Sequence, residues 1–150
     1  MPQTDPPLLF QLFNEISIIE QLSRSFLSQE LPQGLTVPHF FVLNYLSRAG
    51  DGATPMTLAQ AFQVPKTSLT HTLSGLETRG LVSVRRNPRD GRSKQVWLTQ
   101  AGRDVRARVI AGLAPKFQTL ARGLDVDHLA DALPILQSLR QFMETHRPKR

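Results

Sequence analysis

The chain has 150 residues, a formal net charge of +6 and no cysteine. This length suits one domain, so residues 1–150 are expected to fold as a single unit. The missing cysteine excludes disulfides, thiolate catalysis and a cysteine redox switch. No apolar run approaches the ~20 residues of a membrane span, and residues 1–7 are not a signal peptide. We therefore expect a cytoplasmic protein without membrane contact, whose positive charge favours a polyanionic partner.

The first third of the chain predicts two helices. Residues 1–7 are polar and proline-rich, which indicates a loose arm. Apolar residues then recur every three or four positions and predict an amphipathic helix over 8–30. Thr36 can cap a second helix, which tolerates Pro38 in its first turn and stops at the Gly50–Gly52 turn. Its expected core residues are Phe40, Phe41, Leu43 and Leu46.

Two short helices are predicted next. Thr57 and Gln60 match a capping box, which places the start of one helix at Thr57. Pro65 occupies a position typical of the first residue of another helix, and Gly80 provides its C-terminal stop. Three leucines share one face of this second helix and should pack inward, namely Leu69, Leu73 and Leu76.

The rest of the chain predicts a hairpin and two long helices. Residues 81–86 and 94–98 alternate as strands do, and Asn87–Gly91 between them is turn chemistry. Thr99 caps a long helix that Gly112 and Pro115 should bend or weaken. A final helix with a kink at Pro134 leads to the basic end, HRPKR.

This order predicts a mainly α fold with a small β-hairpin wing. Residues 36–99 would form a winged helix-turn-helix, whose second short helix is the right size to enter the major groove of DNA. A basic hairpin beside it can reach the neighbouring minor groove or phosphates. The partner predicted from the residues is therefore double-stranded DNA.

The candidate DNA-binding residues fall into two groups. The first group lies on the outward face of the second short helix, which we call the reading helix, and offers a cation, hydroxyls and an imidazole: Lys66, Thr67, Ser68, Thr70, His71 and Ser74. The second group consists of charged residues on the wing: Arg89, Asp90, Arg92 and Lys94. A charged hairpin can also be an ordinary solvated loop. Asp90 could form a surface ion pair with Arg92, or orient its guanidinium toward the DNA backbone.

The same stretch resembles the MarR (multiple antibiotic resistance regulator) family. The matching motifs are T-x-x-L-x-x-L-E-x-x-G-L-V over 70–82, D-x-R-S-K over 90–94 and L-T-x-x-G over 98–102. The resemblance implies a homodimeric DNA-binding regulator, often a repressor released by a small molecule. It thereby favours 8–30 and 100–146 as dimerisation helices, although a monomer could fold these helices onto its own core. Symmetric dimers match palindromic operators.

The resemblance also implies a small aromatic or phenolic effector, bound where the winged core meets the dimerisation helices. Phe13, His39 and Phe40 are candidates to line such a cavity, with core packing as the alternative for the phenylalanines. No cofactor is expected.

Other functional classes have less support in the sequence. The four histidines lie on different segments without metal-ligand spacing, so no metal site is expected. There is no nucleophile–base pair and no glycine-rich phosphate loop, and we do not expect an enzyme. The alternative to a DNA reader is a winged-helix module that binds an acidic partner protein.

Overall fold

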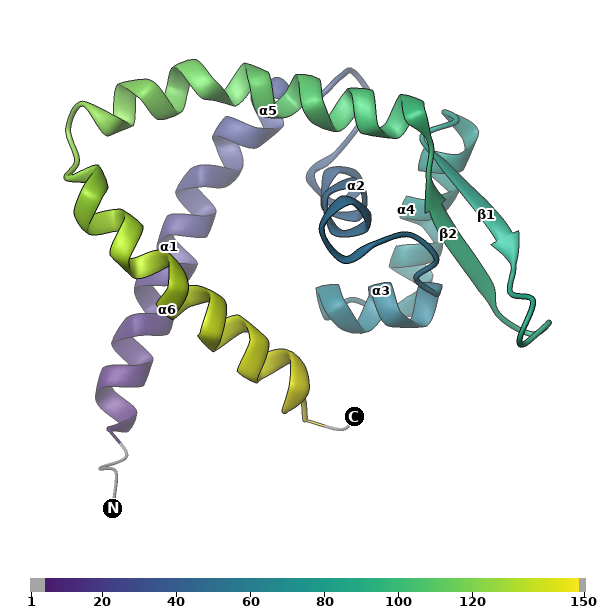
Figure 1. Cartoon of the computed structure of the whole chain (residues 1–150), viewed down its shortest axis with the longest axis horizontal. Coiled ribbons are helices and arrows are strands. Elements are labelled where there is room, and N and C mark those ends of the chain that lie inside the picture. Colours follow the sequence, from purple (N-terminus) through teal and green to yellow (C-terminus); the bar gives the residue numbers. More distant parts are fainter. Residues whose placement is uncertain (1–4, 149–150) are drawn as a thin grey trace.

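The computed structural model describes residues 5–148 and contains six helices and two strands. The elements are α1 (Pro6–Glu30), α2 (Val37–Ala49), α3 (Pro55–Phe62), α4 (Lys66–Thr78), β1 (Val82–Arg86), β2 (Lys94–Leu98), α5 (Gln100–Ala121) and α6 (Val126–Thr145). The compact part comprises α2, α3, α4 and the hairpin, whereas α1 and α6 stand apart from it (Figure 1). Helix α5 links the two parts. The predicted mainly α fold with a β-hairpin wing is confirmed.

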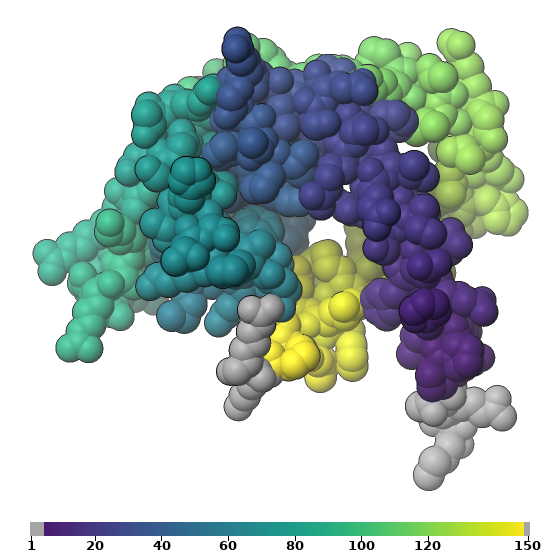
Figure 2. Space-filling model, turned by 180° about the vertical axis from the view of Figure 1, so that it is seen from behind, coloured from purple at the N-terminus to yellow at the C-terminus, as the bar shows by residue number. Residues whose placement is uncertain are grey.

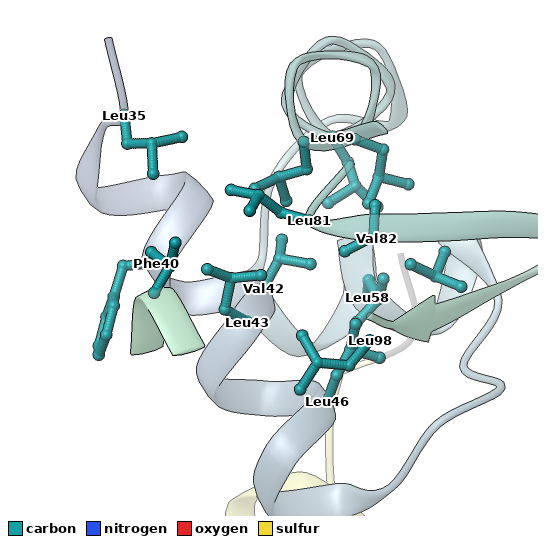
Figure 3. Close-up of a cluster of buried hydrophobic side chains, with 14 of the residues drawn as sticks. Leu35, Phe40, Val42, Leu43, Leu46, Leu58, Leu69, Leu81, Val82 and Leu98 are labelled. Atoms are coloured by element: carbon teal, nitrogen blue, oxygen red, sulfur yellow. The ribbon is translucent and has the colours of Figure 1, made fainter. Parts of the chain in front are cut away.

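One hydrophobic core holds the compact part together (Figure 3). The leucine stripe of α4 packs into it as predicted, because Leu69, Leu73 and Leu76 are all buried. Val42 of α2 is fully buried too, although it was not among the residues expected in this core. Helix α5 enters the core with Val105, Val109 and Leu113, while α1 and α6 contain no buried residue.

The hairpin is antiparallel, with Val82 opposite Leu98 and Val84 opposite Val96. Strand alternation places these apolar side chains on the face toward the helices. An additional bridge joins Ala53, in the loop between α2 and α3, to Val96. Strand β2 is therefore paired on both sides, with β1 and with this loop.

Two predicted helix starts need correction. Helix α1 begins at Pro6 rather than Leu8, because the Asp5 carboxylate accepts the Leu8 N–H; residues 1–4 of the predicted arm lie outside the described residues. Helix α3 begins at Pro55 rather than Thr57, so the predicted Thr57–Gln60 capping box is wrong. Thr54 is the N-cap, and its hydroxyl oxygen accepts the Thr57 N–H.

One proline also lies at a different position from the one predicted. Pro65 is the N-cap of α4, so the first helical residue is Lys66. Pro115 and Pro134 both lie within uninterrupted helical spans, α5 and α6. Helix α5 curves gently along its length in Figure 1 but does not break. Thr99 caps α5 as predicted, since its hydroxyl oxygen accepts the Gly102 N–H at 3.0 Å.

Candidate nucleic-acid interface

Helix α4 has one buried face and one polar, exposed face. All six helix residues predicted to bind DNA are exposed. The hydroxyl of Thr70 donates to the Lys66 carbonyl at 2.9 Å, which fixes the rotamer of this side chain and leaves its oxygen free to accept. The buried leucines thus hold α4 in place and its other face is available to a partner.

The back of α4 rests on the imidazole of His39 from α2. A Cβ added at Gly75 would lie 2.8 Å from His39 Nε2, so this glycine provides the space that the ring occupies. On the other side of the ring, Nδ1 accepts the Thr36 N–H at 2.9 Å. This bond requires an unprotonated Nδ1, and burial together with the nearby Arg79 and His71 charges lowers the pKa of His39 below 6.5. The ring is a neutral spacer between α2 and α4.

The C-terminal end of α4 is fixed by backbone geometry. Gly80 has φ +69°, and the Gly80 and Leu81 N–H groups donate to the carbonyls of Glu77 and Leu76. This is the Schellman arrangement, which closes a helix and redirects the chain. Arg79 adds a long-range contact, because its guanidinium donates to the Gln33 carbonyl at 2.8 Å. The reading helix is thereby tied to the turn between α1 and α2.

The wing is held to α4 and has an ordered tip. Glu77 of α4 accepts the Val84 N–H of β1 at 3.3 Å. At the tip, the side chain of Asn87 bonds that of Ser93, and the Asp90 carboxylate accepts the Arg92 N–H at 3.0 Å. The side chains of Asp90 and Arg92 do not form an ion pair with each other within residues 5–148. Asp90 therefore shapes the turn. Neither of the two alternatives, a surface ion pair with Arg92 or a guanidinium held by the carboxylate, is observed among the ion pairs of the described residues.

Helix α4 and the wing enclose one groove of about 710 Å³, which we call the reading groove. Six of the ten predicted residues line it: Lys66, Thr70 and Ser74 from α4, with Asp90, Arg92 and Lys94 from the wing. The remaining four, Thr67, Ser68, His71 and Arg89, are exposed but are not part of its lining. The helix and the wing thus present their charges and hydroxyls to a single concave surface.

Sequence reasoning missed part of this groove. Thr54, Pro55 and Met56 form one wall, and Met56 is 62% exposed. These residues were expected to precede or begin α3, and no charge or motif marked them. The sole tryptophan, Trp97, was also missed; the Arg85 guanidinium lies 4.7 Å from the centre of its ring. Cross-strand neighbours of this kind could have been found from the hairpin register.

The candidate effector residues do not line the reading groove, and each lies in different surroundings. Phe40 belongs to the core, Phe13 is exposed on α1, and His39 contacts α4. Across the same residues, the acidic and histidine side chains form no group able to hold a metal ion. No helix in this part of the chain is long and apolar enough to cross a membrane.

The winged core and its flanking helices are similar to known proteins. The model of the MarR family matches residues 33–93, which contain α2, α3, α4, β1 and the wing tip. A mutant MarR from Escherichia coli, solved in complex with operator DNA, is 26% identical with a TM-score of 0.68, over 91% of this chain and 99% of that one. The winged core thus belongs to the MarR family of winged helix-turn-helix transcriptional regulators, which bind DNA and are not enzymes.

Two further MarR-like structures show how widely the fold is shared. The regulator BldR from Sulfolobus solfataricus is 24% identical, with a TM-score of 0.71 over 91% of this chain and 99% of BldR. PcaV from Streptomyces coelicolor, solved with its natural ligand, is 23% identical, with a TM-score of 0.66 over 94% of this chain and 98% of PcaV. At these identities the likeness is one of fold, and it extends beyond the winged core to α1, α5 and α6.

Proposed function

We propose that this MarR-family regulator acts as a homodimeric repressor on a pseudo-palindromic operator. The observation that carries the DNA-reading part is the reading groove, because α4 and the wing line it together. Major-groove readers need short polar side chains on an exposed helix, and phosphate contacts need cations beside it. Lys66, Thr67, Ser68, Thr70, His71 and Ser74 would address bases or flanking phosphates, and Arg89, Arg92 and Lys94 would serve the wing, with Asp90 shaping its turn.

The exposed apolar faces of α1 and α6 support the dimer. Ile19 is 61% exposed and Leu133 is 56% exposed, and neither helix buries a residue in the single chain. Helices of this length do not normally leave such faces in water, since each buried aliphatic side chain gains about 1.5–3 kcal/mol. A second copy would cover them and would place two reading helices about a two-fold axis. Two half-sites about 10 base pairs apart would then be read together.

The dimer can be tested with two substitutions on one helix. Ile19→Asp places a carboxylate on the apolar face of α1, whereas Gln21→Asp places it on the opposite, polar face. Both positions are exposed in the single chain, so neither change should disturb its fold. Sedimentation of the unaltered protein at micromolar concentration should give about twice 16.8 kDa. Ile19→Asp should give the single-chain mass and Gln21→Asp the doubled mass; a folded monomer of the unaltered chain would contradict the dimer.

The reading role can be tested by separating base contacts from phosphate contacts. Selection from random duplex should first yield an inverted repeat. Arg92→Ala should then weaken binding to selected and random duplexes alike, and lower the salt slope by ~1 for each phosphate that the guanidinium neutralises. His71→Ala and Thr67→Ala should cost ~1–3 kcal/mol at the selected site and little on random duplex. Trp97 in β2 provides an intrinsic fluorescence signal close to the wing.

Repression and release by a small aromatic or phenolic acid complete the proposal. Support for an effector comes from two relatives: PcaV was solved with its natural ligand, and 6-hydroxynicotinic acid regulates the DNA binding of BpsR from Bordetella bronchiseptica. Repression is inferred from the family resemblance. A library of such acids should contain at least one that lowers operator affinity. If none changed affinity while the protein still bound its operator, release by an effector would be wrong. A protein that bound an acidic protein and no duplex would contradict the whole proposal.

A further inference from the structure

A second hollow lies beside the reading groove, and one of its walls is formed by Arg147 and Pro148, which we call the C-terminal segment. Its volume is about 480 Å³, and it is lined by Met56, Ala59, Gln60, Gln63, Val64, Lys66, Arg147 and Pro148. Two of these residues, Met56 and Lys66, also line the reading groove. The two concave surfaces therefore adjoin each other at these two residues. We call the second one the C-terminal hollow.

Helix α6 brings this segment back to the reading helix from the far end of α5. In Figure 1 its C-terminal end lies below α3, and in Figure 2 the same end lies close to the winged core. The Arg48 guanidinium of α2 lies 3.8 Å from the Glu144 carboxylate of α6. The His146 ring stacks on Phe142 with ring centres 4.0 Å apart and ends the helix. Arg147 and Pro148 follow it and line the C-terminal hollow together with residues of α3.

The charges of the C-terminal hollow suit an anion. Its lining contains two cations, Lys66 and Arg147, two side-chain amides and no acidic residue. Among the residues that the structure describes, neither cation takes part in an ion pair. Ala59 and Val64 add apolar surface nearby, which strengthens electrostatic attraction by lowering the local dielectric constant. A guanidinium beside an ammonium is well suited to bind phosphodiester oxygens.

We propose that Arg147 is a further DNA-contacting residue, and that the C-terminal segment binds the sugar–phosphate backbone next to the start of α4. The inference rests on the proposed DNA-reading role, because it places one more phosphate contact at the edge of the reading groove. The observation that carries it is that Met56 and Lys66 line both the reading groove and the C-terminal hollow. The contact would be indifferent to base sequence and would strengthen binding to any duplex.

The test compares two equivalent charge removals in the full-length protein. Arg147→Gln removes the cation from the C-terminal hollow. Arg122→Gln removes an exposed cation at the turn between α5 and α6, at the other end of the molecule. Both variants have the same net charge. Affinity for the selected operator and for random duplex is measured across a salt titration, with thermal unfolding as the check on the fold.

Arg147→Gln should weaken binding to both duplexes by the same factor and lower the salt slope by ~1 per chain. Arg122→Gln should leave the slope unchanged. If Lys66 and Arg147 share one phosphate, the double variant with Lys66→Gln should lose less slope than the sum of the two single changes. Truncation after His146 should lose at least as much slope as Arg147→Gln.

Two results would overturn the inference. An unchanged salt slope for Arg147→Gln would show that Arg147 does not contact the DNA backbone. The DNA-reading role would still hold in that case, because the unaltered protein would bind its operator. Equal losses for Arg147→Gln and Arg122→Gln would show an effect of net charge alone. If the unaltered protein and Arg122→Gln bound no duplex at all, the proposed function would fail, and with it this contact.

Discussion

His39 should make the stability of this protein depend on pH in a specific window. Its Nδ1 accepts the Thr36 N–H at 2.9 Å, and its ring fills the space above Gly75. The folded protein therefore holds the ring neutral, and its pKa is lowered from 6.5 by burial and by the Arg79 and His71 charges. In the unfolded chain the ring takes up a proton as the pH falls through 6.5, whereas in the folded chain it does so only at lower pH. Stability should accordingly be complete above pH 6.5 and should decrease below it.

Two substitutions separate the hydrogen bond from the titration. His39→Ala removes the acceptor and the packing on α4, so it should cost about 1–3 kcal/mol near neutral pH, the sum of a lost hydrogen bond and a small cavity. His39→Gln keeps an acceptor at the third helical position, as in a capping box, but cannot titrate. It should be the more stable variant of the two.

Urea unfolding at several values between about pH 7.5 and pH 5.5 measures both effects. The unaltered protein should lose stability as the pH falls, and His39→Gln should lose clearly less over the same range. His128→Gln, at an exposed ring on α6, is the matched control, and the full decrease should persist in it. If His39→Gln kept the same decrease as the unaltered protein, His39 would not be the titrating group and the reasoning would be refuted.

Other predictions concern the junctions that hold the winged core together. Leu58→Ala should cost about 2–5 kcal/mol in denaturant unfolding, because this side chain is fully buried. Gly102→Ala should destabilise by about 1–3 kcal/mol, since the new methyl group would collide with the Leu81 carbonyl. In the same helix, Gly112→Ala should be close to neutral by the same assay, because the new methyl group meets only the carboxylate end of the Glu30 side chain, which can move. Asp51→Ala should lower the free energy of unfolding by about 1.5–3 kcal/mol, seen as a lower melting temperature. The lost carboxylate accepts the Leu98 N–H of β2 and pairs with Arg103 of α5.

The winged core could be predicted well because its sequence signals are local and agree with one another. The stripe of Leu69, Leu73 and Leu76 specifies a helix face, and Gly80 supplies the positive φ that ends the helix. The hairpin followed from strand alternation on either side of a turn. Six of the ten predicted site residues then line one groove, because helix and wing are adjacent in sequence as well as in space.

The predicted start of α3 was wrong because two threonines compete as caps. Thr54 and Thr57 are three residues apart, and both are chemically able to accept a free N–H. The structure uses Thr54, since Pro55 follows it in the first turn and lacks the N–H that a later position would need. This shift also explains why the Thr54–Met56 wall of the reading groove was missed.

Contacts between distant segments could not be predicted from one sequence. Arg79 meets the Gln33 carbonyl, and Arg147 reaches the hollow beside Lys66, without any motif that links the partners. A basic C-terminal end was visible in the sequence, but its position depends on the path of α5 and α6. Two of its residues, Lys149 and Arg150, lie outside the described part of the chain.

The L-T-x-x-G motif acquires a physical explanation at the junction of the wing and α5. Leu98 is buried in the core, while the Thr99 hydroxyl donates to the Gly80 carbonyl at 2.7 Å and its oxygen accepts the Gly102 N–H. The Thr99 N–H also donates to the Leu81 carbonyl, against which only a glycine fits at position 102. The motif therefore joins the end of the reading helix, the second strand and the start of α5 in one place.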